Sequence, residues 1–272
     1  MTVAAAAPAT ARPSGPTFLH VVRSEWTKLW SLRSTPLALL IATVLGVGLG
    51  AAISAATGSH YAHADLQTKL TWDPTSNSLD GLGIAQLAIV ILGIVVVSGE
   101  YSSGAIRTTL TAVPHRARVL AAKALVYTAV ALVLSEILAF VAFLLGQQII
   151  SGHAPDATLA DPTVLRAVVG AGLYLAALAL LGVAVGALLR HSAAAIASVV
   201  AILFVLPGIG QALPASWRHP IEKYWPTQAG NQVLQVYHDP NALRPWPGFL
   251  LLCLFVAVVL AIAFVLLERR DV

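Results

Sequence analysis

The chain has 272 residues, of which 58% are apolar and 10% are Asp, Glu, Lys or Arg. Ordinary soluble domains contain about 25% of these charged residues, so 16 bases and 12 acids are too few to cover a soluble surface of this size. The composition excludes a soluble enzyme, a nucleic-acid-binding protein and a disordered chain, and it indicates that the main solvent is lipid.

The chain begins with residues 1–16, which are rich in Ala, Pro and Thr and are expected to form a disordered tail. An amphipathic helix is predicted over residues 18–32, because its large apolar side chains fall on one half of the helical wheel. Glu25 interrupts this apolar half. With Trp26 and Trp30 at the depth of lipid headgroups, the helix is expected to lie in the membrane interface. The sequence favours a simple anchor over a lever that also contacts a cytoplasmic partner.

Six segments approach the roughly 20 apolar residues that a helix needs to cross a bilayer core. Residues 17–272 are therefore expected to form a single all-α integral membrane domain with six transmembrane helices. The fifth segment contains Pro207 and Gly208, which predict a bend or break towards its outer end. The six segments run approximately over residues 36–56, 82–98, 124–146, 167–189, 193–213 and 247–267.

Small residues recur at intervals of four in two of these segments. They are Gly46, Gly50 and Ser54 in the first segment, and Gly182 and Gly186 in the fourth. This spacing lets two helix backbones approach closely. We expect these contacts to form within one chain rather than between two copies.

Basic residues are unequally distributed between the two sides of the predicted helices. Cytoplasmic loops of membrane proteins carry an excess of Lys and Arg, so both termini are predicted to be cytoplasmic in a multi-pass protein of the cell membrane. The side that carries the termini has eleven bases, Arg12, Arg23, Lys28, Arg33, Arg107, Arg116, Arg118, Lys123, Arg190, Arg269 and Arg270. The other side has five, Lys69, Arg166, Arg218, Lys223 and Arg244.

The loop between the second and third predicted spans has the pattern of a short helix. Ser102 or Ser103 is predicted to cap its first turn, and the helix is expected to end before Pro114. Ile106 and Leu110 are four residues apart and therefore share one face. Such a helix would offer a rigid surface to a soluble partner. The alternative is an ordinary polar turn with topology-determining charges.

Glu136 is the one carboxylate well inside a predicted span, roughly 20 Å along the helix from Lys123. Carboxylates inside a membrane are costly and usually face a partner or a cavity. Glu136 is therefore a candidate site for a cationic cargo or a proton. The alternative is a protonated side chain that bonds to a neighbouring helix.

Two features lie on the side away from the termini. Residues 214–247 are rich in Trp, Tyr and Pro, and a helix is predicted over residues 228–237. These aromatics favour an interfacial position, either as short helices that dip into the membrane or as an anchored loop. His60, His63 and Asp65 have the residue types of a metal site, but without a further close ligand no bound metal is expected.

Two motifs, considered together, point to a known family. The first is Ser24-Glu25-Trp26-Thr27-Lys28-Leu29 followed by Leu32-Arg33-Ser34-Thr35. The second is Ser98-Gly99-Glu100-Tyr101-Ser102-Ser103-Gly104-Ala105-Ile106-Arg107-Thr108-Thr109-Leu110. They resemble permease subunits of type 2 ATP-binding-cassette exporters, in particular the actinobacterial branch. The resemblance covers the whole plan, namely an interfacial helix, six spans and a cytoplasmic coupling helix between spans two and three.

The resemblance implies a permease that pairs with a second permease, identical or different, and binds two copies of a separate ATPase. The ATPase would bind ATP and Mg²⁺, because these 272 residues contain no Gly-x-x-x-x-Gly-Lys-[Ser/Thr] phosphate loop. The chain itself is therefore not expected to be an enzyme. The alternatives are a secondary transporter and a non-transporting scaffold or immunity-type partner. On this analogy Glu25, Trp26 and Lys28 lie beside the ATPase, and the docking element consists of Glu100, Tyr101, Ser102, Ser103, Ile106 and Arg107.

Overall fold

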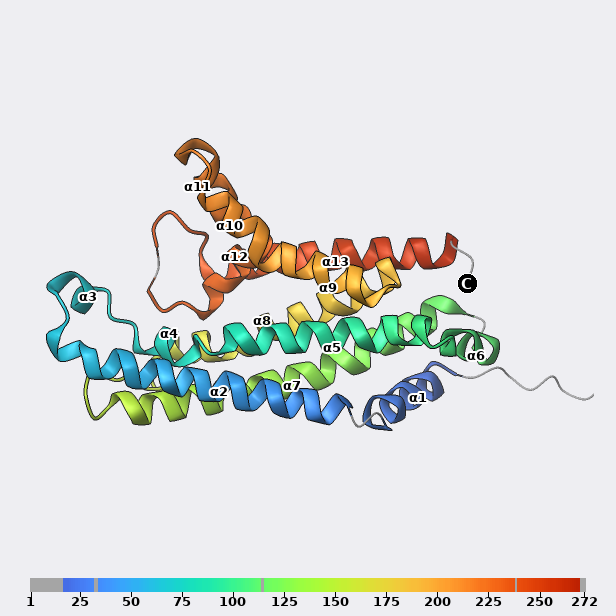
Figure 1. Ribbon diagram of the computed structural model, residues 1–272, viewed down its shortest axis with the longest axis horizontal. Helices are drawn as coiled ribbons and strands as arrows, with labels where there is room; N and C mark the ends of the chain where they lie inside the picture. Colours follow the sequence, from blue (N-terminus) through green and yellow to red (C-terminus); the bar gives the residue numbers. More distant parts are fainter. Residues whose placement is uncertain (1–16, 32–33, 114, 238, 270–272) are drawn as a thin grey trace, which may run out of the picture.

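The computed structural model describes residues 17–31, 34–113, 115–237 and 239–269. The predicted tail, the predicted helix end at Leu32, and Arg33, Pro114 and Arg270 lie outside these residues. The described residues fold into helices without strands (Figure 1). In chain order the elements are α1 (Phe18–Ser31), α2 (Ser34–His60), η1 (Tyr61–His63), α3 (Leu66–Leu70), α4 (Pro74–Leu79), α5 (Leu82–Ser102), α6 (Ala105–Ala112), α7 (Arg116–Ile150), α8 (Pro162–Leu189), α9 (Ser192–Val200), η2 (Ala201–Val205), α10 (Leu206–Gln211), α11 (Ala215–Tyr224), α12 (Pro226–Asn231), η3 (Gln232–Leu234) and α13 (Pro245–Arg269).

Six helical segments in the described chain are long and apolar enough to cross a membrane, and they coincide with the six predicted spans. They are α2, α5, α7, α8, the continuous run α9–η2–α10, and α13. Several extend beyond the predicted ends, and α7 reaches 35 residues. The prediction counted apolar residues only, whereas a helix continues through polar residues as long as its backbone hydrogen bonds are satisfied internally.

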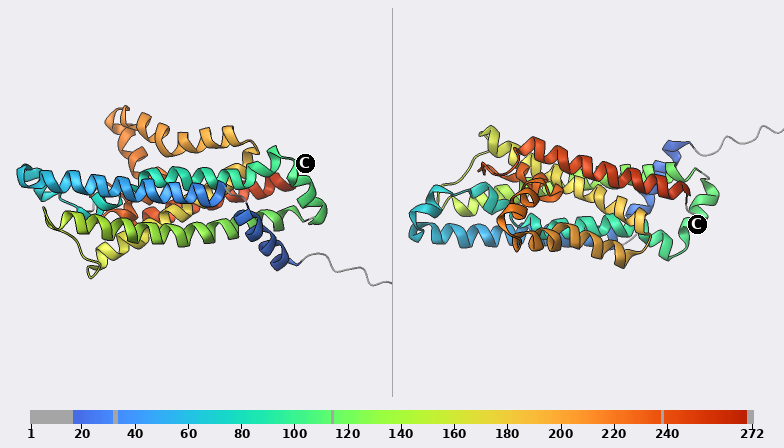
Figure 2. Two further views of the ribbon diagram at one scale, coloured as in Figure 1. Left: turned by 60° about the horizontal axis from the view of Figure 1, so that its bottom comes forward. Right: turned by 90° about the horizontal axis from the view of Figure 1, so that it is seen from above.

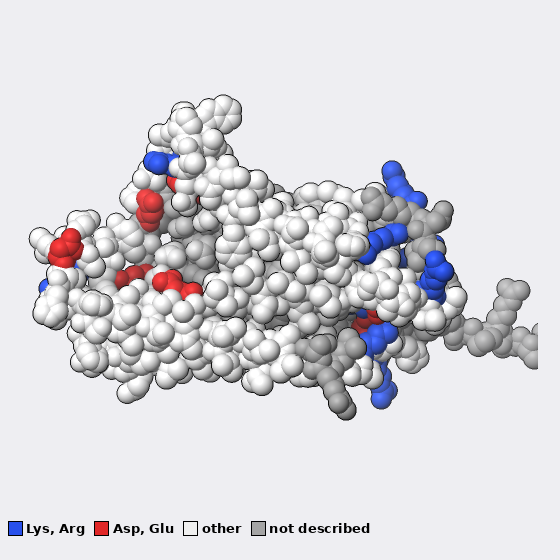
Figure 3. Space-filling view, in the orientation of Figure 1, with Lys and Arg blue, Asp and Glu red and all other residues white. Residues whose placement is uncertain are grey.

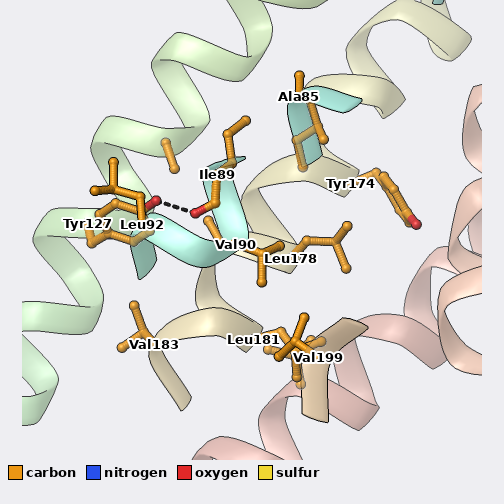
Figure 4. Packing of buried hydrophobic residues seen from close by; sticks show 14 of the residues in the cluster. Ala85, Ile89, Val90, Leu92, Tyr127, Tyr174, Leu178, Leu181, Val183 and Val199 are labelled. Carbon is orange, nitrogen blue, oxygen red and sulfur yellow. Dashed lines mark hydrogen bonds between the residues drawn. The ribbon is translucent and has the colours of Figure 1, made fainter. Parts of the chain in front are cut away.

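The central helix of the bundle is α8, which packs against α5, α7 and α13. In its most apolar stretch 78% of the residues are buried, against 22% in α2 and α13. Figure 4 shows Leu181 of α8 beside Val199 of α9, and Val90 of α5 beside Leu178 of α8. Gly182 permits this approach, because a side chain there would overlap the Val90 carbonyl oxygen. The predicted use of the Gly182–Gly186 pair within one chain is thus confirmed.

The glycines of α2 likewise permit a close approach, in this case to the end of α4 and to the turn between α4 and α5. A Cβ added at Gly50 would lie 2.7 Å from the carbonyl oxygen of Ser78. A Cβ at Gly81 would overlap the backbone of Gly46 and Gly50. The first predicted small-residue motif is therefore also a contact within the chain.

The fifth span is interrupted by a π-helix, η2, before Pro207. Proline has no backbone N–H and its ring clashes with the carbonyl four residues earlier, so the preceding turn widens. The carbonyl oxygen of Ile202 in this turn accepts a hydrogen bond from the indole Nε1 of Trp225, at 2.9 Å. The predicted irregularity is confirmed, and it lies in the middle of the span rather than only at its outer end.

The helix predicted over residues 228–237 is wrong in its bounds. Instead α12 begins at Pro226, a residue whose fixed φ suits the first helical turn. A 3₁₀ turn then ends at Leu234, and Gln235 is extended. The guanidinium of Arg166 in α8 donates to the carbonyl oxygens of Val233 and Gln235, at 3.2 and 2.9 Å. The chain therefore leaves the helix where α8 provides other partners for its carbonyls.

Opposite charges gather at opposite ends of the molecule (Figure 3). Lys and Arg cluster at the end that carries α1, α6 and the last turn of α13, which we call the basic end. Most visible Asp and Glu lie at the end that carries α3, α4, α11 and α12, the acidic end. In every view α1 lies at the same end as α6, and α9–α10 lie over α5 (Figures 1 and 2).

Candidate functional site

The helix α1 lies against α7 through one stripe of its surface. The stripe consists of Val21, Glu25 and Leu29, which are spaced by four residues and are all buried. Trp26 and Trp30 lie on the exposed side, with ring centroids 5.9 Å apart. The helix is amphipathic as predicted, and its one anomaly, Glu25, lies in the middle of the buried stripe.

Glu25 is buried because two lysines neutralise it. Its Oε2 accepts a hydrogen bond from Lys123 Nζ at 2.6 Å, and its Oε1 accepts one from Lys28 Nζ at 2.8 Å. Both lysines also donate to Oε1 of Glu100, each at 3.0 Å. Lys28 donates further to the hydroxyl of Thr109 in α6, at 3.2 Å. We call Glu25, Lys28, Glu100 and Lys123 the four-charge cluster.

The four-charge cluster is electrically neutral, and it connects α1, α5 and α7. The side chains of Glu25 and Lys123 are only 3% and 5% exposed, so their mutual attraction is little screened by water. Burial by itself would lower the pKa of Lys28, but hydrogen bonds and Coulombic attraction from Glu25 and Glu100 outweigh it. The pKa of Lys28 is therefore raised, and this lysine stays charged.

The turn from α5 into α6 depends on Gly104 rather than on a serine cap. Gly104 has φ of +73°, a left-handed conformation that glycine adopts without steric cost. Ser102 and Ser103 both donate their hydroxyl hydrogens backwards to the carbonyl oxygen of Gly99, at 3.0 and 2.8 Å. The predicted N-cap is therefore wrong, because these hydroxyls donate to a carbonyl oxygen near the end of α5 rather than accept from the first amides of α6. The predicted end of the short helix is confirmed, since α6 ends at Ala112.

The predicted docking residues separate into two groups. Ile106 is buried, and with Leu110 it lines a small space between α6, α7 and the end of α13, so the two share a face as predicted. Tyr101 is half-buried, with the guanidinium of Arg190 5.1 Å from its ring centroid. Glu100 belongs to the four-charge cluster. Only Ser102, Ser103 and Arg107 of the predicted set are exposed.

Sequence reasoning missed Lys123 as a site residue and counted it only as a topology-determining base. The signal was the acid on the apolar half of the N-terminal helix. A carboxylate in that position needs a cation from another helix. Lys123 is one of three bases near the start of a mostly apolar 35-residue helix, so the sequence contained the partner but did not identify it.

Glu136 lies in α7 and faces α8. Its carboxyl group occupies the place that a side chain at Gly172 would fill, since a Cβ added there would overlap it. The residue is half-buried, and within the described residues no ion pair or hydrogen bond of its side chain is found. The arrangement brings Glu136 to a helix–helix contact, and its predicted role as a cargo or proton site stays a prediction.

His60, His63 and Asp65, the residues considered as a metal site, lie at the ends of three successive helical elements. Asp65 caps α3 by accepting a hydrogen bond from the amide of Thr68 at 2.9 Å, and bonding to Thr68 lowers its pKa. His60 ends α2, and His63 ends the 3₁₀ turn that follows. Among the described residues, no three His, Cys, Asp or Glu side chains are grouped closely enough to hold a metal ion.

Comparison with known proteins identifies one family. Residues 75–272, nearly three quarters of the chain, match the model of the family described as ABC-2 family transporter protein. No curated protein matches the sequence. The matched residues include Glu100, Lys123 and all of α6, whereas α1 precedes them.

Proposed function

The chain belongs to the ABC-2 family of transporter proteins, and from this premise we propose that it is the membrane-spanning permease subunit of an ABC-type exporter. As a multi-pass membrane protein of this family it is a transport component. The further proposal is that it forms the cargo path and couples to a separate ATPase. The motifs also favour the actinobacterial branch, which stays a proposal.

The observation that carries this proposal is the attachment of α1 and α6 to the same ion cluster. Lys28 of α1 bonds to Glu100 of α5 and to Thr109 of α6, while Glu25 bonds to Lys123 of α7. The outer face of α6, with Arg107 and Thr108, is exposed beside this connection. A partner that pushes on α6 would therefore move α1, α5 and α7 together.

ATP hydrolysis would be coupled to transport because the ATPase contacts α6 differently before and after it closes. ATP binding would close the two copies of the ATPase, and each copy would move the α6 that it contacts. ATP and Mg²⁺ would be held by the ATPase, since these residues contain no phosphate-binding loop. A second permease, either a copy of this chain or a different one, would complete the path.

The proposed orientation places the basic end in the cytoplasm of a cell membrane. The unequal distribution of Lys and Arg supports it, since cytoplasmic loops carry the positive excess. Both termini and α6 would then face the ATPase. The segment from α11 to η3 would lie at the outer surface, as re-entrant helices or as an anchored loop.

Reversing the charge of Arg107 tests the docking surface. We expect Arg107→Asp to weaken binding of the co-purifying ATPase at least about tenfold, or about 1.4 kcal/mol. Arg107 is exposed on α6, so reversal of its charge would act directly on a partner that binds there. Ile106 is not chosen, because it is buried and its replacement would damage the fold. The measurement is titration of purified ATPase onto the immobilised permease, together with permease-stimulated ATP hydrolysis.

The matched control for this experiment is Arg118→Asp. Arg118 is also exposed at the basic end, but it belongs to the first turn of α7 rather than to α6. The same charge reversal there should leave ATPase binding within about twofold of the unchanged protein. Equal effects of the two substitutions, or no effect of Arg107→Asp, would contradict docking at α6.

A role of Glu136 in transport is tested by its isosteric amide. Once a cargo has been identified by stimulated ATP hydrolysis, we expect Glu136→Gln to lower the transport rate about tenfold, because a cargo or proton contact loses its charge. The substitution Asp156→Asn, in an exposed loop at the acidic end, is the control. Unchanged transport in the Glu136 variant would assign this residue to packing against α8 alone.

The alternatives are a secondary transporter and a non-transporting scaffold or immunity-type partner. Each predicts that no ATPase co-purifies with the chain. Co-purification from the native membrane therefore separates them from the permease.

A further inference from the structure

A cavity of about 250 Å³ lies towards the acidic end of the molecule. It is lined by the turn between α4 and α5, by α8, by the π-helix η2 and by α12 with η3, and it is partly open to the surface, where Asp80 is exposed. Figure 3 shows the surface hollowed between the α10–α11 arm and the bundle, with acidic side chains along the lower wall. The widened turn of η2 and the indole of Trp225 keep this arm in place.

Two side chains with hydroxyl groups line the cavity, and the hydroxyl of one of them is buried without a partner. Thr227 is 3% exposed, and its Oγ1 has no hydrogen-bond partner within the described residues. Tyr174 is 6% exposed as a residue and lies at the edge of the packed core (Figure 4). Its hydroxyl makes no hydrogen bond in the described chain and, unlike that of Thr227, is not among the buried unpaired atoms. Buried polar groups in folded proteins are nearly always paired. A ligand with hydrogen-bonding groups would pair both.

The charge of the cavity is negative. Asp80 lines it from the turn before α5, and in the described part of the chain its carboxylate makes no hydrogen bond or ion pair. The surrounding protein raises the pKa of Asp80 by removing water, and the nearby charge of Asp73 raises it further. The described residues that line the cavity include no Lys, Arg or His. The site therefore lacks a cation.

The remaining wall combines amide groups with apolar side chains. Gln86, Gln228 and Asn231 offer amide oxygens, while Leu203 and Phe204 are apolar. A cavity of this kind suits an amphiphilic ligand. Without a cation in its lining it is unsuited to a phosphate or carboxylate. A single carboxylate is also too few for a divalent metal, which usually takes several.

We propose that this cavity binds the ammonium group of a cationic amphiphile, with Asp80 as the counter-ion and Tyr174 and Thr227 as hydrogen-bonding partners. A protonated amine has three N–H donors, which fit a carboxylate and neutral oxygens. The apolar part of the ligand lies against Leu203 and Phe204. That this ligand is the exported cargo rests on the proposed function, but its binding does not.

The test uses the full chain in lipid nanodiscs, without an ATPase. The probes are hexylammonium, hexanol and hexanoate, which share one apolar chain and differ in the head group. Binding is measured by ligand-observed NMR against empty nanodiscs. We expect hexylammonium to bind at least ten times more tightly than the other two. Comparable affinities of the three probes would overturn the proposal.

Three variants identify the binding residues. Asp80→Asn should weaken hexylammonium binding about tenfold, and the matched control Asp156→Asn should leave it unchanged. Thr227→Val keeps the side-chain shape and should weaken binding several-fold, which covers the case that Asp80→Asn fails to fold. Unaltered affinity in both Asp80→Asn and Thr227→Val would overturn the site.

The two proposals fail in different ways. Binding of hexylammonium without ATP-driven transport would contradict the exporter function and leave the site in place. ATP-driven transport without hexylammonium binding would overturn only the site.

Discussion

Replacing Lys123 with Met is expected to reduce the free energy of unfolding by about 3 kcal/mol. The substitution leaves the carboxylates of Glu25 and Glu100 with Lys28 as their only cation in the cluster. Removal of one partner from a buried ion pair typically costs about 3–5 kcal/mol. The lower end applies here, because Lys28 remains 2.8 Å from Glu25. Unfolding of the purified protein in mixed micelles, followed by circular dichroism, measures the change.

A double substitution separates charge from packing in this experiment. Glu25→Gln combined with Lys123→Met restores neutrality, and it should be more stable than Lys123→Met alone by at least about 1 kcal/mol. The control is Arg118→Met, which removes a base from an exposed position in the same helix and should change stability by less than about 0.5 kcal/mol. A double variant as unstable as the single one would show that the aliphatic part of Lys123, not its charge, matters.

A single methyl group at Gly81 is expected to be the second severe change. Gly81→Ala would place a Cβ against the carbonyl oxygen of Gly46 and the amide nitrogen of Gly50, both backbone atoms of α2. Neither atom can move away without shifting the helix, so we expect a loss of about 1–3 kcal/mol. Small residues allow such close contacts between membrane helices. Thermal unfolding measured by light scattering would detect the change.

The control for Gly81 lies two residues further along the chain. Gly83 has no atom within 4 Å of the position of an added Cβ. Gly83→Ala should therefore leave stability unchanged, or raise it by up to about 1 kcal/mol through the higher helix propensity of alanine. Gly81 already has φ of −59°, which alanine also adopts, so any difference between the two variants reports the contact with α2. Equal stability of both would rule out this contact.

The six spans could be predicted because hydropathy along a helix is a property of consecutive residues. The same is true of the amphipathic pattern of α1 and of the unequal charge at the two ends. The prediction was wrong for the serine cap of α6 and for the bounds of α12. In both cases a competing contact decided the local structure, namely the Gly99 carbonyl for Ser102 and Ser103, and Arg166 for the chain after η3.

The candidate site was predicted in part. Glu25, Lys28 and Glu100 were selected individually from two motifs, and the structure brings these three together with Lys123. Ile106 was also selected, but it is buried against its own chain. A motif identifies residues that are distinctive in sequence, whereas exposure depends on which helix lies beside each one.

Three features of this protein follow from its sequence alone. The scarcity of charge indicated a membrane protein, the apolar segments gave the number of possible spans, and the positions of Lys and Arg predicted the basic end. Only the tertiary structure decided how the remaining charges are used. Glu25 and Lys123 are separated by 98 positions, and the cavity at Asp80 is lined by helices from distant parts of the chain. Hydropathy acts on each helix separately, but a buried ion pair or a cavity exists only where packed helices meet.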